Sequence, residues 1–296
     1  MRVCDLTKVR GENAGIMAFG FFDSIHLGHR KVIEAAVRLA RETGAVSSVF
    51  LFRNNIYPIL GIDKYPIYTF DERISFIETL GVDAVYYVDA EADYLSMSPR
   101  MFLEEVRSRV TLDGFTCGSD FTFGAKGLGK VSDLISGIGG RYQVIDLAMR
   151  NGEKISTERV KVALREGDLA TVRDCLGRDF TITRKVLQGR KDGSKIGFPT
   201  VNTALFSVPL RDGVYFTEIE IEKKRYRAVT NVGAHPTFGD MSSNIESHIL
   251  DFEGELYGRE IKNTFLAYHR PIEKFISVDA LRERIAADVK ERKEYD

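Results

Sequence analysis

Between residues 16 and 146, short apolar runs alternate with longer amphipathic segments, and this alternation constrains the fold more than any other feature of the 296-residue chain. A short apolar run fits a buried strand, whereas apolar residues three and four apart fit one face of a helix. Strands are predicted at 16–19, 46–51, 84–88, 115–117 and 142–146, and helices near 31–41, 71–80, 98–109, 157–165 and 168–176. Strands joined through helices form a parallel sheet. We therefore expect an α/β domain with a parallel sheet over residues 1–176.

The pattern changes after Gly177, where short segments rich in β-branched and aromatic residues follow one another. Such strands, separated by turn residues, are typical of an antiparallel barrel. Strands are predicted at 180–186, 214–221, 226–231, 245–250 and 261–268, with an exposed hairpin tip at 222–225. Leu281, Ile285 and Val289 recur at helical spacing, so a closing helix is expected at 277–290. Residues 177–296 are expected to form this second domain.

Composition excludes several classes of function. The 42 basic and 43 acidic residues leave a formal net charge of -1, so no global basic field favours nucleic acid. The three cysteines lie far apart, which argues against a disulfide framework or a zinc site. No apolar run approaches the ~18 residues of a membrane span, and the first residues do not resemble an export signal. We expect a cytoplasmic protein without nucleic-acid or membrane partners, and its oligomeric state stays open.

A histidine-rich segment joins the first predicted strand to the first helix. His26, Gly28 and His29 lie there, and the protein has only five histidines. A helix N-terminus offers backbone N–H groups, glycine permits close approach, and imidazoles add donors for the same anion. A single histidine here would more often cap or pack the helix. Two histidines around a glycine instead predict a cradle for nucleotide phosphates.

A second phosphate-binding candidate lies in the barrel half. A basic loop at 189–197 is punctuated by glycines and includes Gly189, Gly193, Lys195 and Gly197. Its glycines permit backbone approach to phosphate, and its cations can neutralise the charge. Taken alone, such a loop would more often be an exposed hairpin. The Pro-Thr-x-Asn sequence that follows, at 199–202, is far more specific.

The histidine segment resembles the His-x-Gly-His motif of the nucleotidyltransferase superfamily. Members of this superfamily have Rossmann-like domains and catalyse attack of an acceptor on the α-phosphorus of a nucleoside triphosphate. Segments 118–124 and 156–161 narrow the resemblance to the FAD synthetase half of the bacterial bifunctional riboflavin kinase/FMN adenylyltransferase family. The resemblance implies catalytic roles for His26 and His29. It also implies nucleotide or phosphate contacts for Gly28, Asp120, Ser156, Thr157, Arg159 and Lys161, and a flavin contact for Phe123.

Two segments depart from the family pattern. Arg53-Asn54-Asn55 stands where the family has a Pro-His-Pro turn, and Lys161 stands where it has an arginine. Lysine keeps the charge but lacks the fork of donors that suits phosphate. Because of these departures, two alternative functions stay open. The chain acts only as a kinase, or its first domain is a nucleotidyltransferase with another acceptor.

The barrel half resembles riboflavin kinases. Residues 199–202 are similar to their Pro-Thr-Ala-Asn signature, and later matches follow in the family's order at 213–215, 231–233, 236–238, 246–248, 256–258 and 270–275. The resemblance implies that Thr200 and Asn202 hold Mg²⁺ and nucleotide phosphates, since Mg²⁺ requires oxygen ligands. It implies that Glu246 is the general base, with Glu273 a weaker rival, and that Arg270 lies at the flavin site. Without its neighbours, Glu246 would more often be an outward-facing strand carboxylate.

Together the resemblances imply that the chain phosphorylates riboflavin to FMN with ATP, and adenylylates FMN to FAD with release of pyrophosphate. Its expected small-molecule partners are riboflavin, FMN and ATP, with ATP as co-substrate and Mg²⁺ as cofactor. A flavin- or nucleotide-sensing paralogue is the alternative from another class. A sensor has no need of a base such as Glu246, so the enzyme interpretation is preferred.

Overall fold

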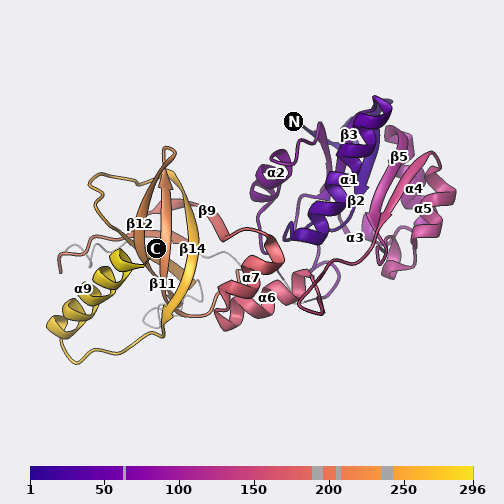
Figure 1. Cartoon of the computed structure of the whole chain (residues 1–296). Coiled ribbons are helices and arrows are strands. Elements are labelled where there is room, and N and C mark those ends of the chain that lie inside the picture. Colours follow the sequence, from indigo (N-terminus) through magenta and orange to yellow (C-terminus); the bar gives the residue numbers. More distant parts are fainter. Residues whose placement is uncertain (63–64, 189–195, 205–207, 235–242, 296) are drawn as a thin grey trace. The chain divides into compact units, whose positions relative to one another are not determined.

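A computed structural model describes residues 1–296 except 63–64, 189–195, 205–207, 235–242 and 296. The chain forms two compact units, Met1–Thr157 and Glu158–Asp296 (Figure 1). Residues 158–176, which the sequence pattern placed with the first domain, belong to the second compact unit, where the backbone N–H of Arg211 donates to the Leu164 carbonyl at 3.0 Å. The functional boundary after residue 176 stays a prediction.

The first unit is a six-stranded parallel sheet with connecting helices (Figure 1). Its strands are β1 (Arg2–Asp5), β2 (Glu12–Phe19), β3 (Ser47–Phe52), β4 (Ala84–Val88), β5 (Val110–Gly118) and β6 (Arg141–Ile145). Its helices are α1 (Leu27–Thr43), α2 (Phe70–Glu78), α3 (Ala92–Leu95), α4 (Pro99–Arg109) and α5 (Val131–Ile138). A hairpin of β7 (Met149–Arg150) and β8 (Glu153–Lys154) follows. The predicted parallel α/β domain is confirmed.

The strand order of this sheet is β1-β4-β3-β2-β5-β6. The chain moves outward from β2 through β3 to β4, and then returns to place β5 on the other side of β2. The connections after β2 and β5 therefore diverge at a topological switch point, which is where open α/β sheets bind ligands. Because the histidine segment directly follows β2, the topology carries it to this point.

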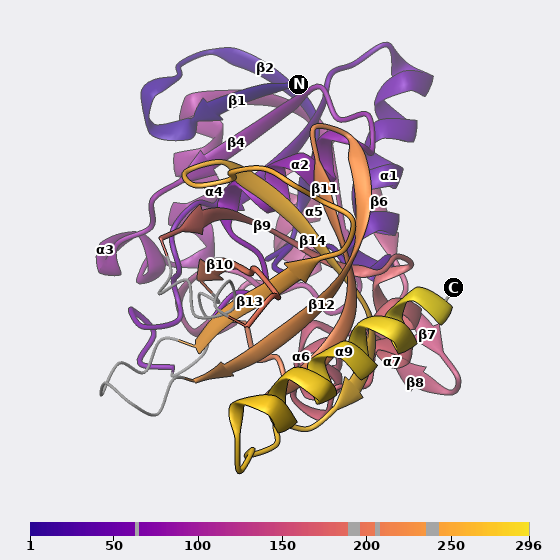
Figure 2. The same cartoon turned by 90° about the vertical axis from the view of Figure 1, so that its left-hand side faces the viewer.

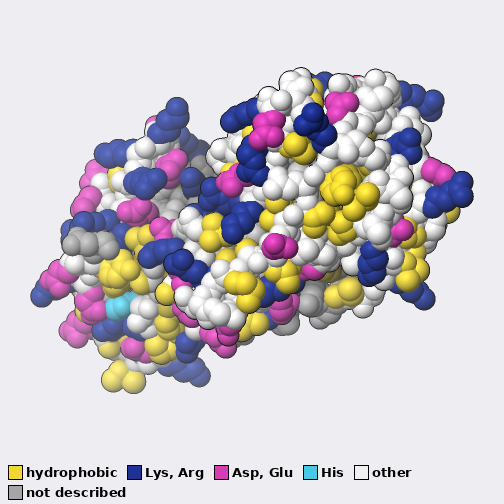
Figure 3. Space-filling model, turned by 45° about the vertical axis from the view of Figure 1, so that its right-hand side comes forward, with side chains coloured by type: hydrophobic (Ala, Val, Ile, Leu, Met, Phe, Trp, Pro, Cys, Tyr) yellow, Lys and Arg dark blue, Asp and Glu magenta, His cyan; other side chains and the backbone are white. Residues whose placement is uncertain are grey.

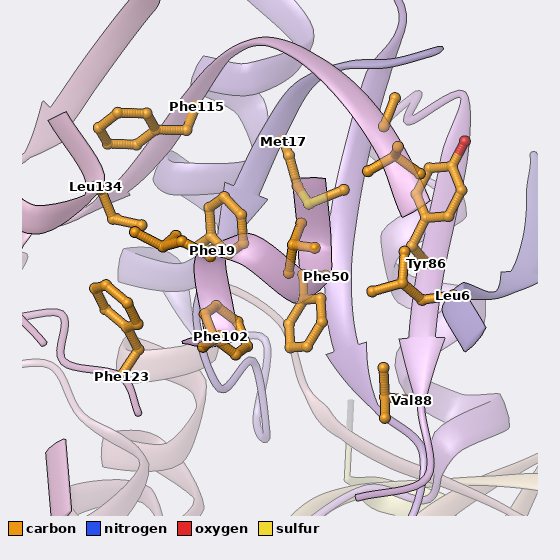
Figure 4. Close-up of a cluster of buried hydrophobic side chains, with 14 of the residues drawn as sticks. Leu6, Met17, Phe19, Phe50, Tyr86, Val88, Phe102, Phe115, Phe123 and Leu134 are labelled. Carbon is orange, nitrogen blue, oxygen red and sulfur yellow. The ribbon is translucent and has the colours of Figure 1, made fainter. Parts of the chain in front are cut away.

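Alternation along β2 builds two separate cores, one on each face of the sheet. Met17 and Phe19 pack with side chains of α4 and α5, while the even-numbered residues beside them pack with α1 and α2. Figure 4 shows the first of these cores, where the rings of Phe50 and Phe102 gather beside Phe19. Full burial of such a ring contributes about 1.5–3 kcal/mol. The carboxyl end of β2 is therefore firmly held, and with it the start of the histidine segment.

Two elements of the first unit, β1 and α5, were not predicted from the sequence. Strand β1 pairs in parallel with β4, from Arg2 opposite Ala84 to Asp5 opposite Tyr87. Its four residues place only two apolar side chains, Val3 and Cys4, between the charged Arg2 and Asp5, which is too short for an apolar run. Helix α5 is short and contains Gly137, which weakens a helical pattern. Both elements are stabilised by packing against the sheet, which a local pattern does not record.

The second unit is a closed antiparallel barrel with helices before and after it (Figure 2). Its strands are β9 (Phe180–Leu187), β10 (Val201–Ala204), β11 (Gly213–Ile221), β12 (Lys224–Ala234), β13 (Ser243–Ile249) and β14 (Glu260–Arg270), in the order β10-β13-β12-β11-β14-β9. The helices are α6 (Thr157–Glu166), α7 (Leu169–Leu176) and α9 (Val278–Glu294). Figure 2 shows α9 against the outside of the barrel. The predicted barrel and closing helix are confirmed.

Small polar side chains fill the middle of the barrel. The hydroxyl oxygens of Thr217 and Thr230 lie 2.7 Å apart, and those of Thr230 and Ser247 lie 2.8 Å apart. Asn263 donates from Nδ2 to the Ser247 hydroxyl at 3.3 Å, and all four residues are buried. Because side chains alternate along a strand, Glu246 on β13 must point away from this interior.

Helix α9 is fixed to the barrel by two buried charged side chains, Asp288 and Arg292. Arg292 donates from Nε and Nη2 to the Thr217 carbonyl oxygen at 3.2 and 3.0 Å. The pairing of β11 with β14 shifts register between Phe216 and Thr217. A shift of this kind interrupts the ladder of hydrogen bonds, so the guanidinium supplies donors that the neighbouring strand does not.

Figure 3 shows acidic and basic side chains interspersed over the visible face, as the near-zero net charge suggests. Among the helices that the structure describes, none is both long and apolar enough to cross a membrane.

We predict that Arg292→Met loosens α9 without unfolding the barrel. The methionine keeps the apolar stem but leaves the buried Thr217 carbonyl without its donors, which costs about 1–3 kcal/mol. Hydrogen exchange of the α9 amides should therefore accelerate. Arg282→Met removes an exposed guanidinium from the same helix and should change the exchange by no more than about 0.5 kcal/mol. Equal effects of the two substitutions would contradict the assigned role of Arg292.

Candidate active sites

The first cavity lies at the switch point of the parallel sheet and has a volume of about 330 Å³. Its lining comes from the ends of β2, β5 and β6 and from the segment after the β7–β8 hairpin. Six residues predicted for the site line it: His26, Gly28, His29, Asp120, Ser156 and Thr157. The fold thus gathers three sequence segments that lie far apart in the chain.

His26 caps helix α1 and its tautomer follows from this contact. Its Nδ1 atom accepts a hydrogen bond from the backbone N–H of His29 at 3.0 Å. An accepting nitrogen carries no proton, so the neutral ring carries its proton on Nε2. His26 is buried at 7% exposure and lines the cavity. The cavity wall therefore includes an imidazole with a defined donor.

His29 stacks on His26, with ring centroids 3.6 Å apart and an angle of 17° between the planes. Its Nδ1 atom is buried and has no hydrogen-bond partner among the described residues. Burial lowers the pKa of His29 well below its usual value, and the nearby charge of a protonated His26 lowers it further. His29 is consequently neutral near pH 7, and it offers a dipole and a donor to an anion rather than a full charge.

The loop that carries the histidines holds an uncommon backbone shape. Phe22 and Ile25 both have φ of 45°, in the left-handed region that costs about 1–2 kcal/mol for a residue with a side chain. Both side chains are buried at 1% exposure, and this burial offsets the cost. A Cβ on Gly28 would lie 3.0 Å from Cε1 of His26. Glycine is therefore needed at this position to keep His26 in place.

Lys154 is a site residue that the motif analysis missed. It is the only lysine or arginine among the described residues that line the first cavity. Its Nζ atom lies 2.5 Å from the Asp120 carboxylate. The signal in the sequence was weak, because Lys154 reaches Asp120 only through the β7–β8 hairpin, whose tip is Asn151-Gly152.

A second residue beside the site that was not predicted to take part in it is Ser24, which is fully buried. Its hydroxyl lies 3.0 Å from the Thr157 hydroxyl, so it links the histidine loop to the segment that carries Ser156. A serine in a loop gives no signal of such a contact, because its partner is distant in the sequence.

Three residues predicted for the first site are not among the described residues that line its cavity. Phe123 is buried at 7% exposure in the core that contains Phe102, and its neighbour Phe121 lines the cavity instead. Arg159 and Lys161 belong to the second compact unit, and Lys161 is buried at 3% exposure. The roles assigned to these residues stay predictions.

The segment that departs from the family's Pro-His-Pro turn is anchored to the neighbouring strand end. Asn54 donates from Nδ2 to the Ala90 carbonyl at 2.8 Å and accepts from the Ala90 N–H at 3.0 Å. The Arg53 guanidinium pairs with Asp89 and lies 4.8 Å from the ring centroid of Tyr87. Two polar contacts thus hold the chain after β3 where the family uses proline.

The second cavity, of about 720 Å³, lies between the outer face of the barrel and α9. Strand pairing sets a row of opposed residues across five strands: Asn202 opposite Glu246, Glu246 opposite Asn231, Asn231 opposite Val214, and Val214 opposite Arg270. Opposed residues share one face of a sheet, so the predicted base and its neighbours face the same side. Four of the five, all except Asn202, line the cavity.

Thr200 lines both this cavity and a third one of about 450 Å³. The third cavity has apolar walls that include Val186 and Leu256, and it also contains Ser247 and Tyr257. His248 holds the chain near Thr200, because its Nδ1 lies 2.9 Å from the Pro199 carbonyl oxygen. Thr200 is therefore positioned between two neighbouring spaces large enough for small molecules.

Arg270 is bound by carboxylates on two sides. Its Nη2 and Nε atoms lie 2.6 and 3.0 Å from Asp288 on α9, and its Nη1 lies 3.6 Å from Glu273. Hydrogen bonding to Asp288 raises the pKa of Arg270. Asp288 is buried, and it also lies 2.9 Å from Arg284 and 3.1 Å from His269. Asp288 was not predicted as a site residue, because its periodic position in the helix gives no sign of its partner on β14.

The predicted basic loop falls largely outside the described residues. Gly189, Gly193 and Lys195 lie in the undescribed range 189–195. The predicted match at 236–238 lies in another undescribed range, 235–242. Gly197 is described and has φ of 86°, which favours glycine, while Ile196 beside it lines the second cavity.

These features define the class of the protein as an α/β nucleotidyltransferase-type sheet joined to an antiparallel barrel with a closing helix. The sequence matches the family model described as FAD synthetase over residues 9–159 and the model described as riboflavin kinase over residues 176–295. The chain therefore belongs to the bifunctional riboflavin kinase/FMN adenylyltransferase family.

Relatives of the chain support the same assignment. It is 33% identical to the bifunctional riboflavin kinase/FMN adenylyltransferase of Bacillus subtilis, with 95% of this chain and 92% of the relative covered. It is 31% identical to the Listeria monocytogenes protein of that name, with 92% and 90% covered. A crystal structure described as a macrolide-efflux protein from Streptococcus pneumoniae matches with a TM-score of 0.87 and 25% identity, covering 100% of this chain and 99% of that one.

We predict that His29 makes the stability of the first unit depend on pH. Its pKa is lowered in the folded chain, so below about pH 6.5 the unfolded chain binds a proton that the folded chain does not. The free energy of unfolding should therefore fall as pH drops through this value. In His29→Asn the fall should be smaller, by at most about 1.4 kcal/mol per pH unit.

Hydrogen exchange of the α1 amides at pH 7, 6 and 5, corrected for intrinsic rates, measures this slope. His248→Asn, in the second unit, serves as the control and should leave the slope at α1 unchanged. An α1 slope that is the same in His29→Asn and in the unmodified chain would show that His29 is not the titrating group.

Proposed function

We propose that the chain makes FMN from riboflavin and ATP in its second unit and FAD from FMN and ATP in its first. The observation that carries the kinase half is the position of Glu246 in a cavity that shares Thr200 with a neighbouring cavity. Phosphoryl transfer needs an acceptor space and a nucleotide space that meet at one point, and Thr200 marks such a point. Membership of the bifunctional family supports both halves.

In the kinase half, the larger cavity suits the flavin and the smaller one suits ATP. The larger cavity has apolar walls from Val214, Leu281 and Ile285, as a flat aromatic ring requires. The ribityl 5′-hydroxyl oxygen attacks the γ-phosphorus of ATP, the bond from that phosphorus to the bridging oxygen of ADP breaks, and Glu246 accepts the hydroxyl proton. A carboxylate in this role typically contributes about 10²–10⁴-fold to the rate.

Thr200 and Asn202 fit a Mg²⁺ ion that is shared with nucleotide phosphates. Both offer oxygen atoms, which Mg²⁺ prefers, and Mg²⁺ is commonly held by few protein groups together with phosphate and water. In the described part of the chain, no group of three or more His, Cys, Asp or Glu side chains could hold a metal alone. When bound, Mg²⁺ neutralises charge on the transferring phosphate. Thr200 and Asn202 would hold it beside Glu246, which is opposite Asn202 in the strand pairing.

In the adenylyltransferase half, an FMN phosphate oxygen attacks the α-phosphorus of ATP and pyrophosphate leaves. The backbone N–H groups at the start of α1 and the Nε2–H of His26 are donors for the charge that develops there. Lys154, Ser156 and Thr157 line the same cavity and suit the leaving pyrophosphate. Because burial lowers the pKa of His29, this ring acts on the transition state through hydrogen bonding rather than through a full charge.

The site of action that we propose is the cytoplasm.

The kinase-only chain and the sensing paralogue remain the alternatives to be tested, and no specific observation favours either of them. The deciding experiment incubates the purified chain with riboflavin, ATP and Mg²⁺ and separates the three flavins over time. FMN followed by FAD supports both halves. FMN alone would leave a kinase with a repurposed first unit, and tight flavin binding without product would favour the sensor.

We predict that Glu246→Gln lowers the rate of FMN formation by at least about 100-fold, because glutamine cannot accept the proton. Flavin and ATP binding should be retained, since the side chains have the same size, and conversion of supplied FMN to FAD should continue. Glu220→Gln removes a half-buried carboxylate from β11 of the same barrel, outside the described lining of the cavity, and serves as the control. Normal FMN formation by Glu246→Gln would show that another group is the base.

We also predict that His29→Ala lowers FAD formation by at least about tenfold, because it removes a ring from the anion cradle. FMN formation should stay within about twofold, since His29 and the kinase cavity belong to different compact units. Both rates come from the same flavin separation. Equal losses of the two activities would mean that the halves are coupled or that the histidine pair has another role.

A further inference from the structure

The cavity proposed to hold riboflavin carries more acidic than basic groups. Apart from the proposed base Glu246, which takes up a proton in the reaction, its described lining residues include two carboxylates, Glu273 and Asp288, and one guanidinium, Arg270. Two negative charges against one positive charge leave an excess of one. Arg284 and Glu291 of α9, which contact Asp288 and His269, add one charge of each sign and leave this excess unchanged.

Arg270 cannot act as an anion receptor without giving up existing partners. Its Nη2 and Nε atoms are engaged by Asp288 at 2.6 and 3.0 Å, and its Nη1 donates to the Pro271 carbonyl at 3.1 Å near Glu273. The Arg270 side chain is only 11% exposed and that of Asp288 only 2%. A buried bidentate pair of this kind is costly to break. The one guanidinium among the described lining residues is therefore neutralised within the protein.

Resting on the proposed kinase function, we propose that this acid excess makes Glu273 and Asp288 specificity-determining residues of the kinase cavity. They favour an uncharged acceptor and disfavour the phosphorylated product. Riboflavin carries no phosphate, whereas a phosphate monoester carries about -1.5 to -2 charges at pH 7. The reaction thus converts a ligand that the cavity tolerates into one that it repels. Product release is promoted by the same charges that hold Arg270 and α9 in place.

Glu273 is the residue through which the idea can be tested. Its side chain is 46% exposed, so replacing it does not leave a buried group without a partner. Glu283 is an exposed carboxylate on α9 that is absent from the described lining of the cavity, so Glu283→Gln is a matched control. Both substitutions remove one negative charge from the same unit.

The experiment measures transfer of the γ-phosphate of labelled ATP to riboflavin by the full chain, with unlabelled FMN as a competing inhibitor. Label is counted in FMN and FAD together, because adenylyl transfer sends the γ-phosphate of its own ATP into pyrophosphate. The quantity compared is the inhibition constant of FMN divided by the KM of riboflavin. Glu273→Gln should lower this ratio by about three- to tenfold, and Glu283→Gln should leave it within about twofold.

Salt provides a second, independent measurement on the unmodified chain. Repulsion between the cavity and the product is screened by ions, so raising the ionic strength should lower the ratio. This salt dependence should shrink in Glu273→Gln. A ratio that is unchanged in Glu273→Gln, or that rises with salt in the unmodified chain, would overturn the inference while leaving the kinase function intact. Absence of labelled flavin from the unmodified chain would instead overturn the proposed function, and this inference with it.

Discussion

The register of β13 between β10 and β12 decides what chemistry the barrel can perform. Ser247 lies opposite Thr230 and joins the buried hydroxyl chain, and this pairing forces Glu246 to the outer face, opposite Asn202 and Asn231. A slip of one residue would bury the carboxylate among hydroxyls and expose Ser247. Closure of the barrel removes the freedom to slip, because each strand is paired on both sides. The interior hydroxyls therefore specify the site as well as stabilise the fold.

In the first unit, the strand order of the sheet decides where the site forms. The reversal of strand order at β2 and β5 opens a space at their carboxyl ends, and the burial of Phe19 holds the end of β2 in place. The loop then reaches α1 through the left-handed residues Phe22 and Ile25, whose buried side chains keep that shape. His26 completes the sequence of constraints by capping α1, since the cap fixes the ring that lines the cavity.

Both fold classes could be predicted from the sequence because they depend on periodicity, which is a local property. The placement of the histidine segment and of Glu246 could also be anticipated, since strand ends and strand alternation locate them. Contacts between residues that are distant in the sequence could not be predicted in this way. Asp288 occupies an ordinary helical position until Arg270 is brought beside it, and Lys154 lies next to Asp120 only because a short hairpin turns back. Phe123 packs into the core beside Phe102, a placement that its motif does not indicate, and its flavin contact stays a prediction.

The two units handle charge in a related way. In the first cavity burial lowers the pKa of His29, and Lys154 is the one lysine or arginine among the described lining residues. Lys154 is already paired with Asp120, just as Arg270 is paired with Asp288. The difference lies in exposure, because Lys154 and Asp120 are about half exposed, whereas Arg270 and Asp288 are nearly buried. An exposed pair contributes little and exchanges partners at small cost, while a buried pair does not. A phosphate can therefore displace Asp120 from Lys154, and the same group cannot readily displace Asp288 from Arg270.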